Sequence, residues 1–233
     1  MAVTLLNATV NSGQLTVFAG NAATLVRTVS AGADRSLEVT VHWVNGINAD
    51  IVSVTYGGQV LTSAGAKVAN SNLGVQKFTL ADAGIALASN TDVIVTWNDT
   101  PDYAVIGARV WAGVSGVTGY VTTSGVDGGV IALTPASAGA NDYSSASLMA
   151  AGSVASTAGT SQYLIVGSKF YADSIRSGAT NTLSWTEDLG EAYVACAIRL
   201  IAANDPTMAS ARPANATIAS ASLSTTIDMR ATG

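Results

Sequence analysis

The sequence holds one cysteine, Cys196, and one histidine, His42, among its 233 residues. A single cysteine cannot form an intramolecular disulfide, and a zinc site needs several Cys or His ligands, so both are excluded within one chain. Cys196 lies in the apolar run YVACAIRLI, on the same side of the expected strand as Val194 and Ile198, which predicts a buried, unreactive thiol. His42 lies on the polar side of another expected strand, without a G-x-S-x-G motif. We therefore expect a solvent-exposed or interface histidine rather than a catalytic one.

Charge is also scarce. Charged residues make up 11% of the chain, against about 25% in an average globular protein. Ser, Thr, Asn, Gly and Ala must therefore cover much of the surface, which lowers the cost of desolvating it. Such a surface suits a protein that packs against copies of itself or a scaffold, although a neutral secreted domain fits too. The net charge is −5 and the ten basic residues are scattered, so we expect no nucleic-acid partner and no membrane partner.

Targeting segments are not evident. The opening MAVTLLNATVNSGQ lacks the basic region and long apolar run of a signal peptide. The most apolar run near the C-terminus is interrupted by Arg199, so no bilayer-spanning stretch is expected. We expect the protein to be made and folded in a cytoplasm, from which lysis would release it to act outside a cell.

Helical periodicity is nearly absent, and alternation with period two recurs along the chain. In SLEVTVHWV, Leu37, Val39, Val41 and Trp43 point to one side, which is typical of a strand with one buried face. TDVIVTWN and VQKFTL repeat this pattern. More than ten such runs, separated by Gly, Asn and Ser turns, predict an all-β antiparallel sandwich of jelly-roll type. Further expected strands are Gln14–Phe18, Ala23–Val29, Ala49–Tyr56, Gln59–Thr62, Tyr103–Trp111, Ala146–Ala155, Gln162–Tyr171 and Glu191–Ile201.

Two local segments carry specific turn signals. In SVTYGGQVLT, Gly57 and Gly58 supply the positive φ of a two-residue hairpin, which pairs Tyr56 with Gln59. The segment LADAGIALAS is short and interrupted by glycine, so we interpret it as a turn after a strand.

The chain divides by composition into a body and an arm. Residues 1–201 are expected to form the sandwich domain, with a candidate subdivision in the polar stretch near 134–145. Residues 202–233 are rich in small residues and cannot close a core, so we expect an extended C-terminal arm that becomes ordered on a partner. The arm's expected partner-binding anchors are Ile218, Leu223, Ile227 and Met229.

Carboxylates in turns offer the few candidate ligands. Asp99, Asp102 and Asp127 lie in turns, where aspartate usually caps backbone amides. The loop WTEDLGE is a weak candidate for calcium through Glu187, Asp188 and Glu191.

Packing in the core or at its rim is favoured for the tryptophans. Among them Trp185 is the best candidate for exposure and, with Glu187, for binding a ligand such as a sugar.

The hairpin VSVTYGGQVLT, with VTVHWV upstream and AVIGARVWAGVSGV downstream, resembles the β-sandwich modules of bacterial surface proteins and phage virion proteins. TLSWTEDLGEAYVACAIRLI is similar to the closing strand of that module, so the resemblance covers about Leu37 to Ile201. It implies a display, adhesion or coat component and brings no catalytic residues or cofactors.

We therefore expect a structural protein rather than an enzyme. The first hypothesis is a homo-oligomeric phage capsid decoration or accessory protein, which binds the major capsid protein or another virion protein. The alternative is a carbohydrate-binding or adhesin module on a tail fibre or bacterial surface. A glycosidase that uses pairs among Asp99, Asp102, Glu187 and Glu191 is a third, weaker hypothesis.

Overall fold

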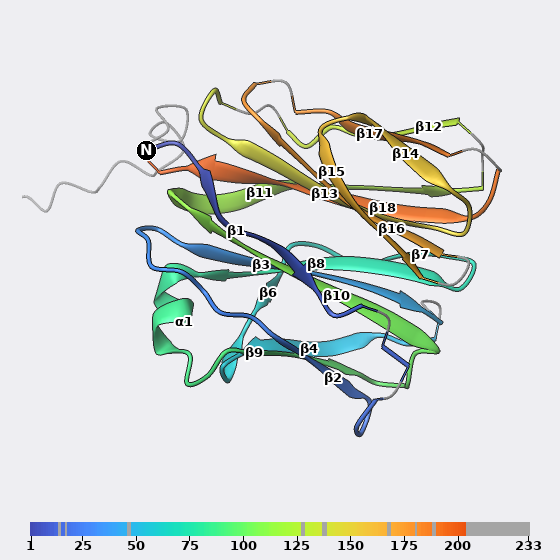
Figure 1. Cartoon of the computed structure of the whole chain (residues 1–233), viewed down its shortest axis with the longest axis horizontal. Coiled ribbons are helices and arrows are strands. Elements are labelled where there is room, and N and C mark those ends of the chain that lie inside the picture. The colour runs from blue at the N-terminus through green and yellow to red at the C-terminus, as the bar shows by residue number, and fades with distance from the viewer. Residues whose placement is uncertain are drawn as a thin grey trace, which may run out of the picture.

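The protein is nearly all-β and its strands pair antiparallel throughout the residues that the structure describes (Figure 1). In this computed structural model these are residues 1–203 except 14, 17, 46–47, 127–128, 137–138, 167–168, 180 and 188–189. The all-β antiparallel fold class predicted from alternation is therefore confirmed.

The strands form four sheets, which we call A to D. Sheet A has the order β1 (Thr4–Asn11), β10 (Tyr103–Ala112), β3 (Ser36–Val44), β8 (Leu73–Ala81), β6 (Thr62–Ser63), and β7 (Val68–Asn70) also pairs with β8. Sheet B has the order β2 (Ala22–Val26), β9 (Asp92–Trp97), β4 (Ile51–Tyr56), β5 (Gln59–Val60). Sheet C has the order β11 (Val114–Gly125), β18 (Tyr193–Ala202), β13 (Tyr143–Ala150), β16 (Lys169–Ser177), β15 (Thr160–Val166). Sheet D has the order β12 (Gly129–Leu133), β17 (Leu183–Glu187), β14 (Val154–Ala158).

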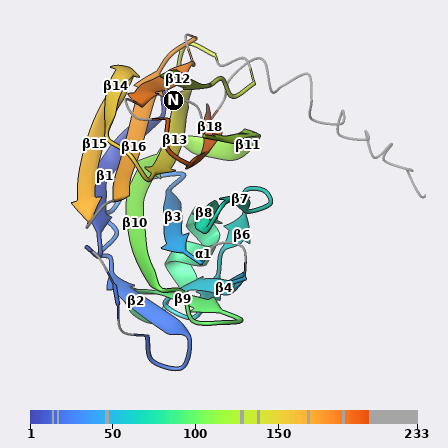
Figure 2. The ribbon, with the colours of Figure 1, turned by 90° about the vertical axis from the view of Figure 1, so that its right-hand side faces the viewer.

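The sheets stack in the order D, C, A, B, as Figures 1 and 2 show from two sides. One apolar core lies between A and B and includes Val39, Val54 and Trp97. Another lies between C and D and includes Leu148 and Trp185. The central interface between A and C has an apolar cluster at each end.

The two halves of the chain repeat one strand order. Sheets A and B come from residues 4–112, and sheets C and D come from residues 114–202. The order β1-β10-β3-β8 in sheet A corresponds to β11-β18-β13-β16 in sheet C, and β2-β9-β4 corresponds to β12-β17-β14. The chain passes between halves at Gly113, which has φ +70°, and an added Cβ there would lie 2.6 Å from the Ala2 carbonyl oxygen. Glycine is therefore required at this crossing.

Most expected strands are present, with some changes of bounds. SLEVTVHWV forms β3, and β9 and β10 match their expected ranges to within a residue or two. Ala146–Ala155 is wrong as one strand, because β13 ends at Ala150 and β14 begins at Val154. Gln162–Tyr171 likewise divides between β15 and β16. Gln14–Phe18 lies partly outside the described residues, and within it Leu15 forms an isolated bridge to Ala104.

The hairpin prediction at Gly57-Gly58 is confirmed. Both glycines have positive φ, +53° and +84°, and Tyr56 pairs with Gln59. An added Cβ on Gly57 would lie 2.6 Å from the Ala88 Cβ, so this turn also packs against the segment after α1.

The interpretation of LADAGIALAS as a turn is wrong, because residues Asp82–Leu87 form the short helix α1. Ile85 is buried in the core between sheets A and B, and this burial stabilises a helix that local propensity does not favour. Asp82 in the first turn forms an ion pair with Arg35 at 2.5 Å.

The predicted subdivision near 134–145 stays a prediction; in the structure Thr134–Asp142 joins β12 and β13 within the second half. The start of the expected arm lies next to the N-terminus. The Met1 amino group donates a hydrogen bond to the Ala203 carbonyl at 2.7 Å. Its anchors Ile218, Leu223, Ile227 and Met229 lie outside the described residues.

Candidate functional site

The polar side of β3 is the first unusual feature of the interior. Glu38, Thr40 and His42 alternate with the core residues of this strand, yet each is at most 2% exposed. The expectation that this side faces solvent is wrong, because sheet C covers it. The side chains meet β13 and β16 in the central interface between sheets A and C.

A buried ion pair lies at the centre of this interface. The Lys77 ammonium on β8 donates to Glu38 Oε1 at 2.5 Å, and both side chains are fully buried. Lys77 also donates to Thr40 Oγ1 at 2.9 Å and to Ser145 Oγ at 3.3 Å. Ser145 donates to Glu38 Oε1 at 2.5 Å, which connects sheet C to the pair. With three acceptors around it, Lys77 is a satisfied cation rather than a nucleophile.

A second ion pair crosses the interface beside the first. Arg109 Nη2 on β10 lies 2.8 Å from Asp173 Oδ2 on β16. Ser147 donates to the same carboxylate, and Trp111 Nε1 donates to Glu38 Oε2 at 2.8 Å. The charges of the two acids and two bases cancel. We call Glu38, Lys77, Arg109 and Asp173, with the hydroxyl groups that bind them, the central charged layer.

Mutual attraction keeps this layer ionised. Burial alone would raise the pKa of Asp173, but the charges of Arg109 and Lys77 outweigh burial and lower the pKa to about 2. The pKa of Glu38 is also lowered, because Lys77 and Arg109 overcome the effect of burial. For Arg109, the carboxylates of Glu38 and Asp173 outweigh burial and raise the pKa. Across the interface the layer thus has one ion pair, Arg109 with Asp173, whereas Glu38 and Lys77 pair within sheet A and reach sheet C through the Ser145 hydroxyl.

His42 lies at one side of this layer. Its ring meets the Tyr171 ring edge to face, with centroids 5.4 Å apart, and neither ring nitrogen has a hydrogen-bond partner. Burial is the main cause that lowers the His42 pKa to about 4; Asp173 opposes this shift, whereas Lys77 and Arg109 add to it. Of the two alternatives expected from the sequence, a solvent-exposed or an interface histidine, the first is wrong, and the imidazole is neutral at pH 7.

Cys196 is fully buried in the same interface, as the sequence predicts. Burial is the main cause that raises its pKa to about 12, so the thiol is protonated and unreactive in the folded protein.

A third buried pair fixes the end of β18. Asp142, fully buried before β13, accepts from Arg199 Nε at 2.7 Å and from the Ala202 amide at 2.7 Å. The Gly139 amide donates to the same carboxylate at 2.8 Å. Arg199 thus anchors the last strand next to the point where the expected arm begins.

Two expected ligand residues in WTEDLGE, Trp185 and Glu187, are buried and contact other parts of the protein. Trp185 is fully buried in the core between sheets C and D, so the favoured core packing is confirmed and its candidacy for exposure is wrong. Glu187 is 2% exposed and accepts from the Gly190 amide at 2.9 Å and from the Glu191 amide at 3.2 Å. Glu187 therefore caps backbone amides, and Asp188 lies outside the described residues.

The remaining carboxylates are dispersed. Asp99 accepts from the neighbouring Thr100 amide at 2.8 Å, and Asp127 lies outside the described residues. The loop with Asp99 and Asp102 belongs to the first half, whereas Glu187 ends β17 of the second half. In the described part of the chain, no three His, Cys, Asp or Glu side chains gather closely enough to hold a metal ion.

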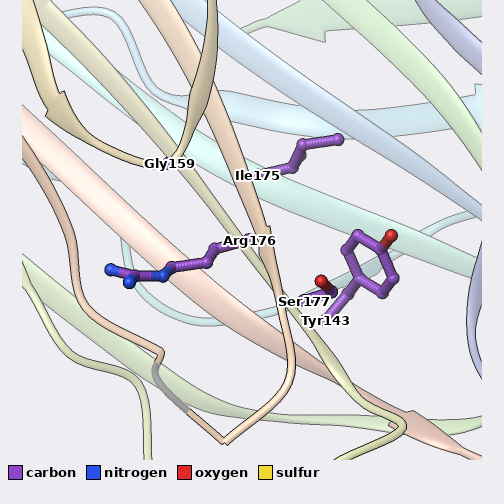
Figure 3. Close-up of a pocket in the computed structure, with 5 residues that line it drawn as sticks. All are labelled: Tyr143, Gly159, Ile175, Arg176 and Ser177. Atoms are coloured by element: carbon purple, nitrogen blue, oxygen red, sulfur yellow. The ribbon is translucent and has the colours of Figure 1, made fainter.

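A shallow pocket of about 230 Å³ lies at the ends of β13 and β16, lined by Tyr143, Gly159, Ile175, Arg176 and Ser177 (Figure 3). Figure 3 shows Arg176 directed away from Ile175 and Tyr143. The Arg176 guanidinium donates to the Thr182 carbonyl at 2.9 Å, so its charge is already engaged within the protein.

The outer face of sheet B is the second unusual feature. Cross-strand pairs align Thr24, Ile94, Thr55 and Val60 in one row across four strands. Their neighbours along each strand point into the core, so this row faces outward. Val26, Val52 and Val60 are 62%, 66% and 69% exposed. Asp92 is the one acidic or basic residue in these four strands, all of which are described.

Comparisons of the chain with protein-family models, with curated proteins and with solved structures found no match. No helix in the described part of the chain has the length and apolar character of a membrane span.

Sequence reasoning missed the central charged layer. Its members are visible in the sequence as charges inside strongly alternating runs: Glu38 in SLEVTVHWV, Lys77 in VQKFTL and Arg109 in VIGARVWA. Local alternation does not distinguish such a charge on a solvated face from one that a second sheet covers.

Proposed function

We propose that the protein is a structural virion component that binds a shell through its sheet faces, most specifically a phage capsid decoration or accessory protein. The strand order supports this proposal. The order β1-β10-β3-β8 in sheet A and β2-β9-β4-β5 in sheet B supports a jelly-roll assignment for the first half, and the second half repeats most of this order. Jelly rolls are common in viral capsid proteins, and we propose that the chain is a tandem pair of them.

The distribution of charge supports a role in protein contact. The sequence has few charged residues, and among the described ones the fold places seven in the interior: Arg27, Glu38, Lys77, Arg109, Asp142, Glu187 and Arg199. The surface is therefore even less charged than the composition alone implies. A neutral surface has a small desolvation cost when it docks against another protein.

The outer face of sheet B carries the proposal. It presents a row of threonine and aliphatic side chains with three exposed valines, and Asp92 is its one ionisable group. Such a face resembles the apolar centre of an interface, from which charged residues are depleted. We propose that this face contacts the shell.

The test compares two matched substitutions. Val60 and Val130 are 69% and 70% exposed on the two outermost sheets, B and D. Both proteins, Val60→Lys and Val130→Lys, are mixed with undecorated shells and measured by co-sedimentation. Val60→Lys is expected to weaken binding at least about tenfold, because the ammonium would be desolvated in the contact. Equal binding by both variants, or no binding by the unmodified protein at any salt concentration, would refute the proposal.

The same strand order also supports the carbohydrate-binding alternative, because jelly rolls occur in lectin domains too. Burial of Trp185 removes the sugar-stacking platform suggested for it from the sequence. A glycan array on the intact protein separates the two functions, since specific glycan binding without shell binding would favour the alternative.

A further inference from the structure

Sheet D has one strand fewer than its counterpart in the first half. Sheet B contains β2-β9-β4-β5, and sheet D contains only the equivalents of the first three, β12-β17-β14. Among the described residues, β14 therefore pairs with β17 on one side and with no strand on the other.

The chain itself explains the difference. In the first half, the turn at Gly57-Gly58 folds the chain back, so that β5 pairs with β4. In the second half, the chain continues from β14 through Gly159 directly into β15, which pairs with β16 in sheet C. Within the described part of the chain, the position that β5 occupies in sheet B thus has no equivalent strand in sheet D.

An edge of this kind is a template for an added strand. Its inner face borders the core between sheets C and D, where Val154 is packed at the rim. A suitable occupant is an extended segment with one apolar face, which would extend that core, and one polar face, which would meet solvent.

The expected arm contains one such segment. In Leu223–Met229, LSTTIDM, the residues Leu223, Thr225, Ile227 and Met229 fall on one side of an extended chain, and Ser224, Thr226 and Asp228 fall on the other. The segment has one charge and no proline or glycine, as a paired strand requires.

The connecting chain is long enough to reach a neighbouring molecule. Residues 204–222 lie between Ala203 and this segment, and 19 extended residues span roughly 60 Å. The four stacked sheets measure only about 30 Å from the first mid-plane to the last.

We propose that Leu223–Met229 of one copy adds as a strand to the β14 edge of sheet D in a second copy. The inference rests on the proposed function, because it supplies the contact by which subunits of a coat layer would be linked. It names the β14 edge as the receiving surface and a second copy of this chain as the partner.

The experiment uses the full chain in three forms. The unmodified protein is compared with a triple variant, Leu223→Ser, Ile227→Ser and Met229→Ser, which removes the apolar side. The matched control, Ser222→Thr, Ser224→Thr and Thr226→Ser, changes only the opposite side. Light scattering after size exclusion measures mass over a range of concentrations, and hydrogen exchange measures protection of residues 154–158.

We expect the unmodified and control proteins to form oligomers whose 154–158 amides exchange at least about tenfold more slowly than in the triple variant, which should be monomeric. A monomeric unmodified protein at every concentration would overturn the proposal, whether or not its β14 amides are protected. An oligomer whose β14 protection is the same in the triple variant would also overturn it. Co-sedimentation of the unmodified protein with shells is measured separately. If the protein forms oligomers with protected β14 amides but does not bind shells, only the proposed function is refuted.

Discussion

Replacement of His42 by phenylalanine should reduce the loss of folding stability that occurs when the pH is lowered from 7.5 to 4. The imidazole is 2% exposed, neutral, and packed against Tyr171. Phenylalanine keeps a ring at this position and does not titrate. The four tryptophans, Trp43, Trp97, Trp111 and Trp185, are all buried, so their fluorescence reports unfolding.

The expected magnitude follows from the lowered pKa. The pKa of His42 in the folded protein is about 4, against an ordinary histidine pKa of 6.5. The unfolded state therefore binds a proton more readily than the folded state, and stability falls as the pH is lowered through 6.5 towards 4. A difference of about 2.5 pKa units corresponds to about 3 kcal/mol at pH 4. Below pH 4 this contribution levels off, because both states are protonated.

Urea unfolding at several pH values between 7.5 and 4 measures this difference. The unmodified protein should lose about 3 kcal/mol more stability over this range than His42→Phe. Titration of Asp173 does not contribute over this range. Its pKa is lowered from 3.8 to about 2, so its contribution to folding stability is lost only below pH 4. Parallel pH profiles for the two proteins would refute the placement of His42 in a closed interface.

Three further perturbations test other parts of the structure. Lys77→Met should cost about 3–5 kcal/mol in urea unfolding, because it leaves Glu38 buried without its main partner. Lys77→Met combined with Glu38→Leu should recover much of that loss, and equal losses in the single and double variants would contradict the pairing. Gly57→Ala should lower the free energy of unfolding more than Gly58→Ala, since both have positive φ but only the Gly57 Cβ would meet Ala88 at 2.6 Å. Cys196 should react with a thiol reagent only as fast as the protein unfolds, and rapid labelling of the native protein would show that the interface opens.

Alternation in the sequence located the strands well where each strand has one strongly apolar side. SLEVTVHWV and TDVIVTWN became β3 and β9, because Val, Ile and Trp at every second position favour a pleated surface against a core. The strands β1 and β11 were not predicted, since TLLNATVN and VSGVTGYVTTSG mix small and polar residues on both sides. Their positions depend on pairing with β10 and β18, which are distant in the sequence.

The stacking of the four sheets could not be predicted from local sequence pattern. Tyr103 and Tyr193 open corresponding strands, yet Tyr103 packs in the central interface and Tyr193 packs in the core between sheets C and D. The first residues of these two corresponding strands therefore face different layers. The covering of Glu38 and His42 by sheet C likewise depends on contacts with Ser145, Asp173 and Tyr171, more than a hundred residues away.

The sequence by itself determined that this chain forms antiparallel strands, that Gly57-Gly58 turns a hairpin and that Cys196 is buried. These follow from local backbone geometry and from the cost of exposing apolar side chains. The tertiary structure alone decided which polar faces are covered, because Glu38, Lys77 and Arg109 can be buried only where opposite charges from neighbouring strands and from sheet C meet them. It also decided that β14 ends sheet D, since strand order depends on long-range pairing rather than on any one segment.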